Sequence, residues 1–481
     1  MHIHILGICG TFMGSMALLA RELGFKVTGS DANVYPPMST QLETQGISLM
    51  QGYKAEHLQP APDLVIVGNA LSRGNEAVEY MLEQGMRYTS GAQWLKENVL
   101  EGRWVLAVSG THGKTTTASM LTWILEYAKM EPGYLIGGIP ADFEVSARLG
   151  NTPFFVIEAD EYDTAFFDKR SKFVHYQPRT VVINNLEYDH ADIFADLAAI
   201  QRQFHHLLRI VPSSGQVIYN GDQASVQQVL DQGCWSEKVS AGGSFTALGA
   251  QETQGDHWTY KLLSADGASF ELYLNAIKVA QIDWQLTGTH NVCNAMMAMI
   301  GARHVGVEPQ HSAAALMAFQ GVKRRMELLA EIQGIKVYDD FAHHPTAIKT
   351  TLEGLRKNAP NDTIIAVIEP RSNTMRLGSH AQQLASSISD ASNTVWYQPE
   401  GLDWQLQDSL LATLPASKVC VKTQISEVID TVITQLKNDV EPSLKAADNN
   451  IKAHVVIMSN GGFGGIHQQL ISRLESVFND L

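Results

Sequence analysis

The sequence has few cysteines, and none of them forms a metal-binding pair. Cys9, Cys234, Cys293 and Cys420 are scattered over 481 residues, and no C-x-x-C spacing occurs. This pattern argues against a disulfide scaffold and a cysteine-based zinc site. We expect four buried free thiols.

Long apolar runs and an excess of positive charge are also missing. No run of about 18 apolar residues is present, so we expect no membrane-spanning helix. Acidic residues outnumber basic ones by 50 to 35, which disfavours the broad phosphate contacts of nucleic-acid binding. The stretch Met1 to Gly7 lacks the basic region of a secretory signal, so we expect a cytoplasmic protein. Nothing in the sequence indicates an obligatory protein partner.

The length predicts about three domains at roughly 150 residues each. Three segments each begin with an apolar strand and then alternate strand and helix patterns, which is typical of α/β folds with parallel sheets. The predicted domains are 1–101, 102–321 and 322–481. The first and third are expected to be Rossmann-like and the second a P-loop ATPase-type domain with a small antiparallel β insertion over 215–285.

Individual elements are predicted from the same patterns. A helix is expected over Met13–Leu23, and the polar stretch 438–450 is expected to be a surface loop. The predicted strands are His2–Leu6, Lys26–Thr28, Asp63–Val67, Phe154–Ile157, Thr180–Ile183, Lys336–Tyr338, Ile364–Ile368 and His454–Met458.

A phosphate-binding loop follows the apolar strand that begins at Val105. The stretch reads Gly110-Thr-His-Gly-Lys-Thr-Thr116 and runs into helix-forming sequence. Backbone N–H groups of such a turn can wrap a phosphate chain, Lys114 can reach its terminal phosphates, and the Thr115 hydroxyl can bind Mg²⁺. Val108 stands where the general phosphate-loop pattern G-x-x-x-x-G-K-[ST] has its first glycine, so the match is to the narrower form Gly-Thr-x-Gly-Lys-Thr-Thr. The alternative is a glycine-rich turn without a ligand.

Two further polar groups follow strands of the same predicted domain. Glu158 ends one strand, and His190 closes the segment after the next. Ligands of open parallel sheets bind beyond the carboxyl ends of the strands, so Thr115, Glu158 and His190 are expected to converge and hold Mg²⁺ beside a triphosphate. In the alternative, Glu158 and His190 only cap or solvate strand ends.

The first segment carries a second glycine turn, with Gly7, Gly10 and Gly14 before a helix. This spacing is not G-x-G-x-x-G and is weak evidence for NAD, although a short turn before a helix suits a diphosphate. Asp31 ends the second strand, where it can accept a ribose hydroxyl. Because the segment is half of a full dinucleotide fold, a sugar nucleotide such as a UDP derivative is preferred.

Other polar motifs lie at the predicted second boundary and in the third segment. His290 and Asn294 begin a helix and can contact a base, and either Arg324 or Arg325 can reach phosphates when the third domain closes. Arg371 and Arg376 suit a substrate with carboxylates. His343 and His344 are adjacent, but sequence neighbours rarely bind one ion, so a metal site there is disfavoured.

Taken together, these motifs resemble the Mur ligases over essentially the whole chain. The family's successive motifs are matched by Gly110 to Thr116, Glu158-Ala-Asp-Glu161, Asp189-His190, Gly288 to Asn294 and Arg324 to Glu327. The resemblance implies an ATP-dependent, ADP-forming ligase with three α/β domains, for UDP-sugar, ATP and peptide in that order. The same resemblance implies a reaction through an acyl phosphate with Mg²⁺ as cofactor.

The resemblance also implies roles for single residues. Catalysis is assigned to Lys114, Glu158, His190 and Arg325, and metal binding to Thr115, Glu158 and His190. ATP is assigned to Gly110, Thr111, His112, Gly113, Lys114, Thr115, Thr116, His290, Asn294, Arg325 and Asp340. The UDP-sugar is assigned to Gly7, Gly10, Thr11, Met13, Ser30, Asp31 and Asn69, and the peptide to Arg371, Asn373, Arg376 and Asn460.

Within the family, the segments Ser30 to Thr40, Glu369 to Met375 and Ser459 to His467 are most similar to ligases of peptidoglycan recycling. These join L-Ala-γ-D-Glu-meso-diaminopimelate to UDP-N-acetylmuramate, and the alternative is the member that adds L-alanine. Several Mur ligases use a carbamylated lysine where this chain reads Gln203-Phe-His-His-Leu207, so no lysine is assigned there. A dehydrogenase and a non-catalytic nucleotide switch are the rivals from other classes.

Overall fold

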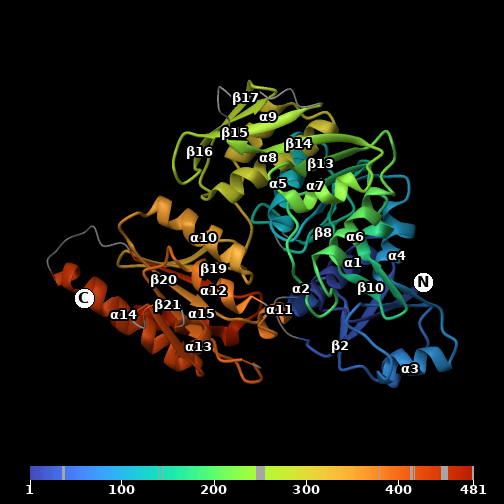
Figure 1. The fold of residues 1–481 in the computed structure, drawn as a ribbon. Helices are drawn as coiled ribbons and strands as arrows, with labels where there is room; N and C mark the ends of the chain where they lie inside the picture. Colours follow the sequence, from blue (N-terminus) through green and yellow to red (C-terminus); the bar gives the residue numbers. More distant parts are fainter. Residues whose placement is uncertain are drawn as a thin grey trace.

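A computed structural model describes most of the chain as three α/β lobes (Figure 1). In Figure 1 the N-terminal lobe is blue, the central lobe runs from cyan to yellow, and the C-terminal lobe is orange to red. The described residues are 1–34, 38–138, 140–143, 145–244, 255–378, 380–402, 404–411, 415, 418–445 and 453–478. The predicted α/β class is confirmed, while the exact domain boundaries stay predictions.

The N-terminal sheet is parallel and has the strand order β3-β2-β1-β4-β5. Its strands are β1 His2–Leu6, β2 Lys26–Asp31, β3 Ser48–Gln51, β4 Leu64–Val67 and β5 Tyr88–Ser90. Its helices are α1 Thr11–Glu22, α2 Met38–Thr44, α3 Glu76–Glu83 and α4 Gly91–Leu95, with single turns at Ala55–Leu58 and Lys96–Leu100. The order in which strands are added to the sheet reverses between β1 and β4, and such a switch point is where parallel sheets bind ligands.

The central sheet has ten strands, in the order β17-β16-β15-β14-β13-β12-β6-β9-β7-β8. The strands are β6 Trp104–Ser109, β7 Gly133–Leu135, β8 Ala147–Arg148, β9 Phe154–Glu158, β12 Thr180–Ile183, β13 Gln216–Asn220, β14 Glu237–Ser244, β15 His257–Leu262, β16 Ser269–Leu274 and β17 Ile277–Asp283. The helices are α5 Lys114–Tyr127, α6 Leu197–Leu208, α7 Ala224–Asp231, α8 Thr289–His304 and α9 Pro309–Met317. A separate hairpin, β10 Asp163–Ala165 with β11 Asp168–Ser171, leads into a turn at Lys172–His175.

The predicted β insertion is antiparallel only in part. β15, β16 and β17 pair in antiparallel fashion, whereas β13, β14 and β15 pair in parallel. These strands therefore extend the main sheet, because β13 continues the parallel ladder from β12. The short alternating stretches in the sequence reveal exposed faces but not strand direction.

The C-terminal sheet has the order β18-β19-β23-β20-β21-β22, and only the β18–β19 pair is antiparallel. Its strands are β18 Glu327–Ile332, β19 Ile335–Asp340, β20 Thr363–Ile368, β21 Asn393–Tyr397, β22 Val419–Lys422 and β23 Ala453–Met458. Its helices are α10 Pro345–Asn358, α11 Asn373–Arg376, α12 Ala381–Ser387, α13 Leu406–Leu411, α14 Ile425–Lys445 and α15 Ile466–Phe478, with one turn at Phe463–Gly465.

Two expectations from the sequence are corrected. The stretch 438–450 is not a loop throughout, since α14 continues to Lys445 and only 446–450 lies outside the described residues. Residues 438–445 belong to a helix that has one buried face at Val428, Val432 and Leu436. The four cysteines are free, as expected, but each is only partly buried.

The core is continuous between the first two lobes. One buried apolar cluster includes Ile3 and Met16 of the N-terminal lobe together with Phe155 and Phe204 of the central lobe. The C-terminal sheet has its own buried clusters on its two faces. We expect the first two lobes to behave more like one body, and the C-terminal lobe to depend on the contacts at the site for its position.

Candidate active site

The phosphate loop joins β6 to α5, and its two glycines have backbone angles that only glycine adopts easily. Gly110 has φ of 131° and Gly113 has φ of 78°. A Cβ atom on Gly113 would lie 2.5 Å from the side-chain oxygen of Asn294, so α8 packs directly against the loop. Lys114 donates to the Gly110 carbonyl at 2.8 Å, and its ammonium lies 3.3 Å from carboxylate oxygens of Asp160 and Glu161.

The three strand ends named in the sequence analysis meet beside this loop. The Thr115 hydroxyl donates to Glu158 Oε1 at 2.9 Å, and the other oxygen of Glu158 accepts the Gly137 N–H at 2.7 Å. His190 Nε2 lies 3.1 Å from Glu161 Oε1. β12, β6 and β9 are neighbours in the sheet, so their carboxyl ends bring these groups together.

The electrostatics of the site depend on Glu161. Burial acts to raise the pKa of Glu161, but Lys114 and His190 outweigh it and lower the pKa to about 2. Burial acts in the opposite sense on His190, whose pKa is nevertheless raised by the hydrogen bond to Glu161. The pKa of Glu158 is raised by burial and by Asp160. A cation placed beside Glu158 would relieve this repulsion, so the donor set fits a divalent metal ion.

Glu161 and Asp189 lie in two of the sequence motifs, but no role was predicted for either residue. Glu161 links Lys114 to His190, and Asp189 accepts the backbone N–H of His190 and the hydroxyl of Thr374 at 2.8 and 2.6 Å. His190 itself has φ of 56°, a left-handed conformation that tertiary contacts must hold. The sequence did hold a signal for both carboxylates, since Asp189 directly precedes His190 and Glu161 lies three residues after Glu158.

The remaining residues of the loop are held by the segment after β12. The Thr111 hydroxyl accepts the Glu187 N–H at 2.9 Å, and the His112 N–H donates to the Asn185 side chain at 2.8 Å. Thr116 is buried in the first turn of α5. These hydrogen bonds to the segment after β12 hold the phosphate loop in shape.

Adjacent His343 and His344 take different roles. His343 Nδ1 pairs with the Phe341 carbonyl, whereas His344 Nδ1 accepts the Thr346 N–H and caps α10. His344 also lies near His112 and Glu187 of the central lobe, with 3.5 Å between His344 Nδ1 and Glu187 Oε2. Because that nitrogen already accepts a backbone hydrogen bond, this group is an interlobe contact rather than a ready metal site.

The groups predicted for adenosine and phosphate lie between the central and C-terminal lobes. Asn294 accepts a hydrogen bond from Thr117 at 3.2 Å, and His290 Nδ1 is buried without a hydrogen-bond partner among the described residues. Asp340 accepts backbone N–H groups of Met326 and Ala342 at 2.9 and 2.8 Å. Burial and the nearby Arg325 lower the pKa of His290 to about 4, so the ring is neutral near pH 7.

The two neighbouring arginines are clearly distinguished by their contacts. Arg324 pairs with Asp339 at 3.0 Å and donates to the carbonyls of Ser459 and Gly461, so it is a structural residue. In the described part of the chain Arg325 makes no ion pair, and its guanidinium lies 5.0 Å from the Phe341 ring centre. It is the arginine whose charge is available to a ligand.

The N-terminal glycine turn lies at the switch point of the first sheet. Gly7 has φ of 84°, and the Gly7 N–H donates to the carbonyl of Ser30 at 2.8 Å. Asp31 accepts the backbone N–H groups of Cys9 and Asn33, both at 2.9 Å. Thr11 begins α1, Met13 is buried, Gly10 precedes the helix and Asn69 follows β4. Residues 35–37 of the Ser30 to Thr40 motif lie outside the described residues.

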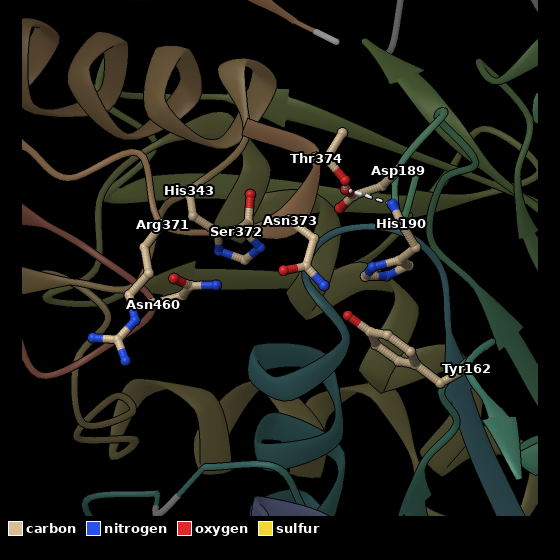
Figure 2. A pocket seen from close by; sticks show the side chains of 9 residues that line it. All are labelled: Tyr162, Asp189, His190, His343, Arg371, Ser372, Asn373, Thr374 and Asn460. Carbon is tan, nitrogen blue, oxygen red and sulfur yellow. Dashed lines mark hydrogen bonds between the residues drawn. The ribbon is translucent and has the colours of Figure 1, made fainter. Parts of the chain in front are cut away.

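A cavity of about 190 Å³ separates the two carboxyl edges of the central and C-terminal sheets. Figure 2 shows Arg371 and Asn460 on one side, Tyr162 and His190 on the other, and Asn373 between them. Arg376 does not line this cavity, and its guanidinium donates to the Gly401 carbonyl at 3.4 Å. Three of the four predicted peptide residues are thus together. The full lining is Tyr162, Asp189, His190, His343, Arg371, Ser372, Asn373, Thr374 and Asn460.

Comparison with known proteins identifies three consecutive family models. They are described as the Mur ligase family catalytic domain over residues 2–102, the Mur ligase middle domain over 108–302 and the Mur ligase glutamate ligase domain over 324–445. No helix in the described segments is long and apolar enough to cross a membrane.

The relatives differ in their sequence identity to this chain and in the share of it that they cover. The UDP-N-acetylmuramate–L-alanyl-γ-D-glutamyl-meso-2,6-diaminoheptandioate ligase of Escherichia coli K12 is 53% identical over 98% of both chains. The UDP-N-acetylmuramate–L-alanine ligase of Dictyoglomus turgidum is 31% identical over 76% of this chain and 75% of its own. A crystal structure of a murein peptide ligase from Psychrobacter arcticus has a TM-score of 0.74 and 48% identity, and covers 99% of each chain.

Proposed function

Because the chain belongs to the Mur ligase family, we propose that it joins L-Ala-γ-D-Glu-meso-diaminopimelate to the lactyl carboxylate of UDP-N-acetylmuramate, with ATP converted to ADP and phosphate. The carrying observation is the 53% identity to the E. coli ligase named for this reaction, which extends over the C-terminal lobe. The match to an L-alanine ligase is weaker and covers about three quarters of the chain. The cavity between Arg371 and His190 supports this choice, since it can admit a peptide with carboxylates.

The reaction needs an activated carboxylate, because a free carboxylate does not accept an amine. A lactyl oxygen attacks the γ-phosphorus of ATP, ADP leaves, and an acyl phosphate forms. The amine of the L-Ala end then attacks the acyl carbon, the amine loses a proton, and the C–O bond breaks to release phosphate. Both steps move negative charge between oxygens, so stabilisation by fixed positive groups supplies most of the catalysis.

The chain's own residues supply this stabilisation. Lys114 binds the β- and γ-phosphates once nucleotide displaces its contact with Gly110, and Arg325 adds a second positive charge from the C-terminal lobe. Thr115 and Glu158 would hold one Mg²⁺ and His190 a second, which neutralises phosphate charge. His290, Asn294 and Asp340 bind the adenosine, while the N-terminal turn with Asp31 binds the UDP-sugar.

The test measures phosphate release from Mg-ATP with UDP-N-acetylmuramate, comparing L-alanine with the tripeptide as amine. We expect release with the tripeptide only, and its loss when EDTA removes Mg²⁺. Release with alanine only would identify an L-alanine ligase. Release with neither amine would contradict the proposal.

A further inference from the structure

Lys172 is a buried cation to which the proposed reaction assigns no role. Its side chain is 6% exposed, and in the described part of the chain its ammonium makes no hydrogen bond or ion pair. The ammonium lies 5.0 Å from the ring centre of Phe12 and 5.4 Å from that of Tyr162. Burying an ammonium between two rings costs solvation that cation–π contacts replace only in part.

The backbone around Lys172 is fixed to the catalytic segment. The Lys172 N–H donates to the Tyr162 carbonyl at 2.9 Å, and the Ser171 hydroxyl donates to the Glu161 carbonyl at 2.6 Å. Glu161 holds Lys114 and His190. Lys172 therefore extends from the catalytic segment of the central lobe toward the N-terminal lobe.

The ring of Phe12 places this ammonium beside the first turn of α1. The first N–H groups of a helix have no intrahelical acceptor, and the start of α1 has neither a side-chain cap nor an acidic residue to satisfy them. A helix N-terminus attracts anions, and here a buried unpaired ammonium lies next to it. The ammonium of Lys172, in the central lobe, thus lies against the ring of the second residue of α1, near the positive end of that helix.

The acidic neighbours of Lys172 do not pair with its ammonium in the described part of the chain. Asp160, Glu161 and Asp163 act electrostatically on Lys172, but burial outweighs them and its pKa is lowered. Asp160 and Glu161 are paired with Lys114, and Asp163 is paired with Lys169 at 2.5 Å. A bound anion would give the Lys172 ammonium an ion-pair partner, which it lacks in the described part of the chain.

We propose that Lys172 and the N-terminus of α1 together bind the diphosphate of the sugar nucleotide, with Lys172 reaching across from the central lobe. This inference rests on the proposed function, because it takes its ligand from there. It adds a residue of the central lobe to a site otherwise built from the N-terminal lobe. Sugar nucleotide would then connect the two lobes directly beside the loop that holds Lys114.

The test is calorimetric binding of UDP-N-acetylmuramate and of UDP to the full-length protein. Lys172→Met and Lys172→Gln remove the positive charge, one with an apolar and one with a polar side chain, and Lys172→Arg keeps it. We expect both neutral variants to weaken both ligands by about tenfold to hundredfold, as for the loss of a charge-assisted hydrogen bond. Lys172→Arg should stay within a few-fold of the wild type.

Lys238→Met is the matched control, because it removes the same charge from an exposed position of the central lobe. It should leave both affinities unchanged, and ATP affinity should be unchanged in all variants. Weakening of UDP-N-acetylmuramate alone would overturn the diphosphate assignment in favour of the lactyl carboxylate. Unchanged affinities, or an equal loss of ATP binding, would overturn the inference altogether.

The two proposals fail in different ways. Wild-type protein that binds UDP and UDP-N-acetylmuramate but releases no phosphate with the tripeptide would contradict the proposed function alone. Wild-type turnover with the tripeptide, combined with unchanged affinities in both neutral variants, would contradict only the role of Lys172.

Discussion

At the scale of single residues, Arg371 and Arg376 differ in their position relative to the cavity, although both were predicted to bind the peptide. Arg371 lines the cavity opposite His190, while Arg376 lies outside it. We expect Arg371→Ala to raise the KM for tripeptide about tenfold or more, because a charge-assisted contact to a carboxylate is lost. The KM for ATP should change little, and Arg376→Ala should have the smaller effect on tripeptide. Steady-state kinetics with each substrate varied in turn checks this, and an unchanged tripeptide KM for Arg371→Ala would remove its assignment.

His4 predicts a pH dependence of stability. Its ring is fully buried, hydrogen-bonded to the hydroxyls of Thr28 and Ser30, and burial lowers its pKa to about 3. An unfolded histidine titrates near pH 6.5, so between pH 6.5 and 3 the unfolded chain binds a proton that the folded chain does not. Stability is therefore lost as pH falls through this range, by up to about 1.4 kcal/mol per pH unit, and is unaffected by His4 above it.

Calorimetric melting at pH 7.5 and 5.5 measures this effect. His4→Asn should be less stable than the wild type at pH 7.5 but should lose less stability on acidification. An equal decrease in Tm for both proteins would show that His4 does not cause the acid sensitivity.

At the scale of elements, α10 packs against the start of α8 through two glycines. A Cβ atom on Gly354 would lie 2.8 Å from the Cα of Gly288, which precedes α8 and has φ of 92°. Alanine is normally favoured over glycine in a helix by about 1 kcal/mol, but here the neighbouring atom is backbone and cannot rotate away. We expect Gly354→Ala to displace α10 from α8 and raise the KM for ATP several-fold, since His290 and Asn294 lie on α8.

Gly301→Ala provides the control for this prediction. Its Cβ atom would lie 3.4 Å from a side-chain methyl of Leu121, which is an ordinary contact. This variant should keep its kinetics and gain up to about 1 kcal/mol of stability. Equal ATP kinetics in both variants would show that the α8–α10 contact does not shape the nucleotide site.

At the scale of the whole molecule, α11 fastens the C-terminal lobe to the central lobe. The Thr374 hydroxyl donates to Asp189 at 2.6 Å and accepts the Ala191 N–H at 3.3 Å. Thr374→Val keeps the shape of the side chain but removes both hydrogen bonds. We expect this loss to destabilise the contact between the C-terminal and central lobes by about 1 to 3 kcal/mol. Small-angle scattering should then show a larger radius of gyration, and kcat should fall.

The same substitution at Thr350 is the control, because its hydroxyl donates within α10 to Ala347 and does not reach the central lobe. Thr350→Val should scatter like the wild type. If Thr374→Val does so as well, with normal kcat, closure depends on other contacts.

The sequence by itself determined the order of strands and helices in much of the chain and the phosphate loop. β1 and β12 were predicted with the observed bounds. These are local properties, because alternation of apolar and polar residues, helix starts and glycine turns act over a few residues. The placement of Thr115, Glu158 and His190 at the carboxyl edge of one sheet also followed, since parallel strands end at one edge.

Only the tertiary structure decided which groups meet across lobes. The separation of Arg371 from Arg376, the structural role of Arg324 and the burial of Lys172 against Phe12 depend on how α11, β23 and α1 pack. Strand direction in the extension of the central sheet was also undecided, because alternation is the same in parallel and antiparallel neighbours. Local sequence patterns specify faces and ends, whereas contacts between distant segments are specified by the packing of the whole chain.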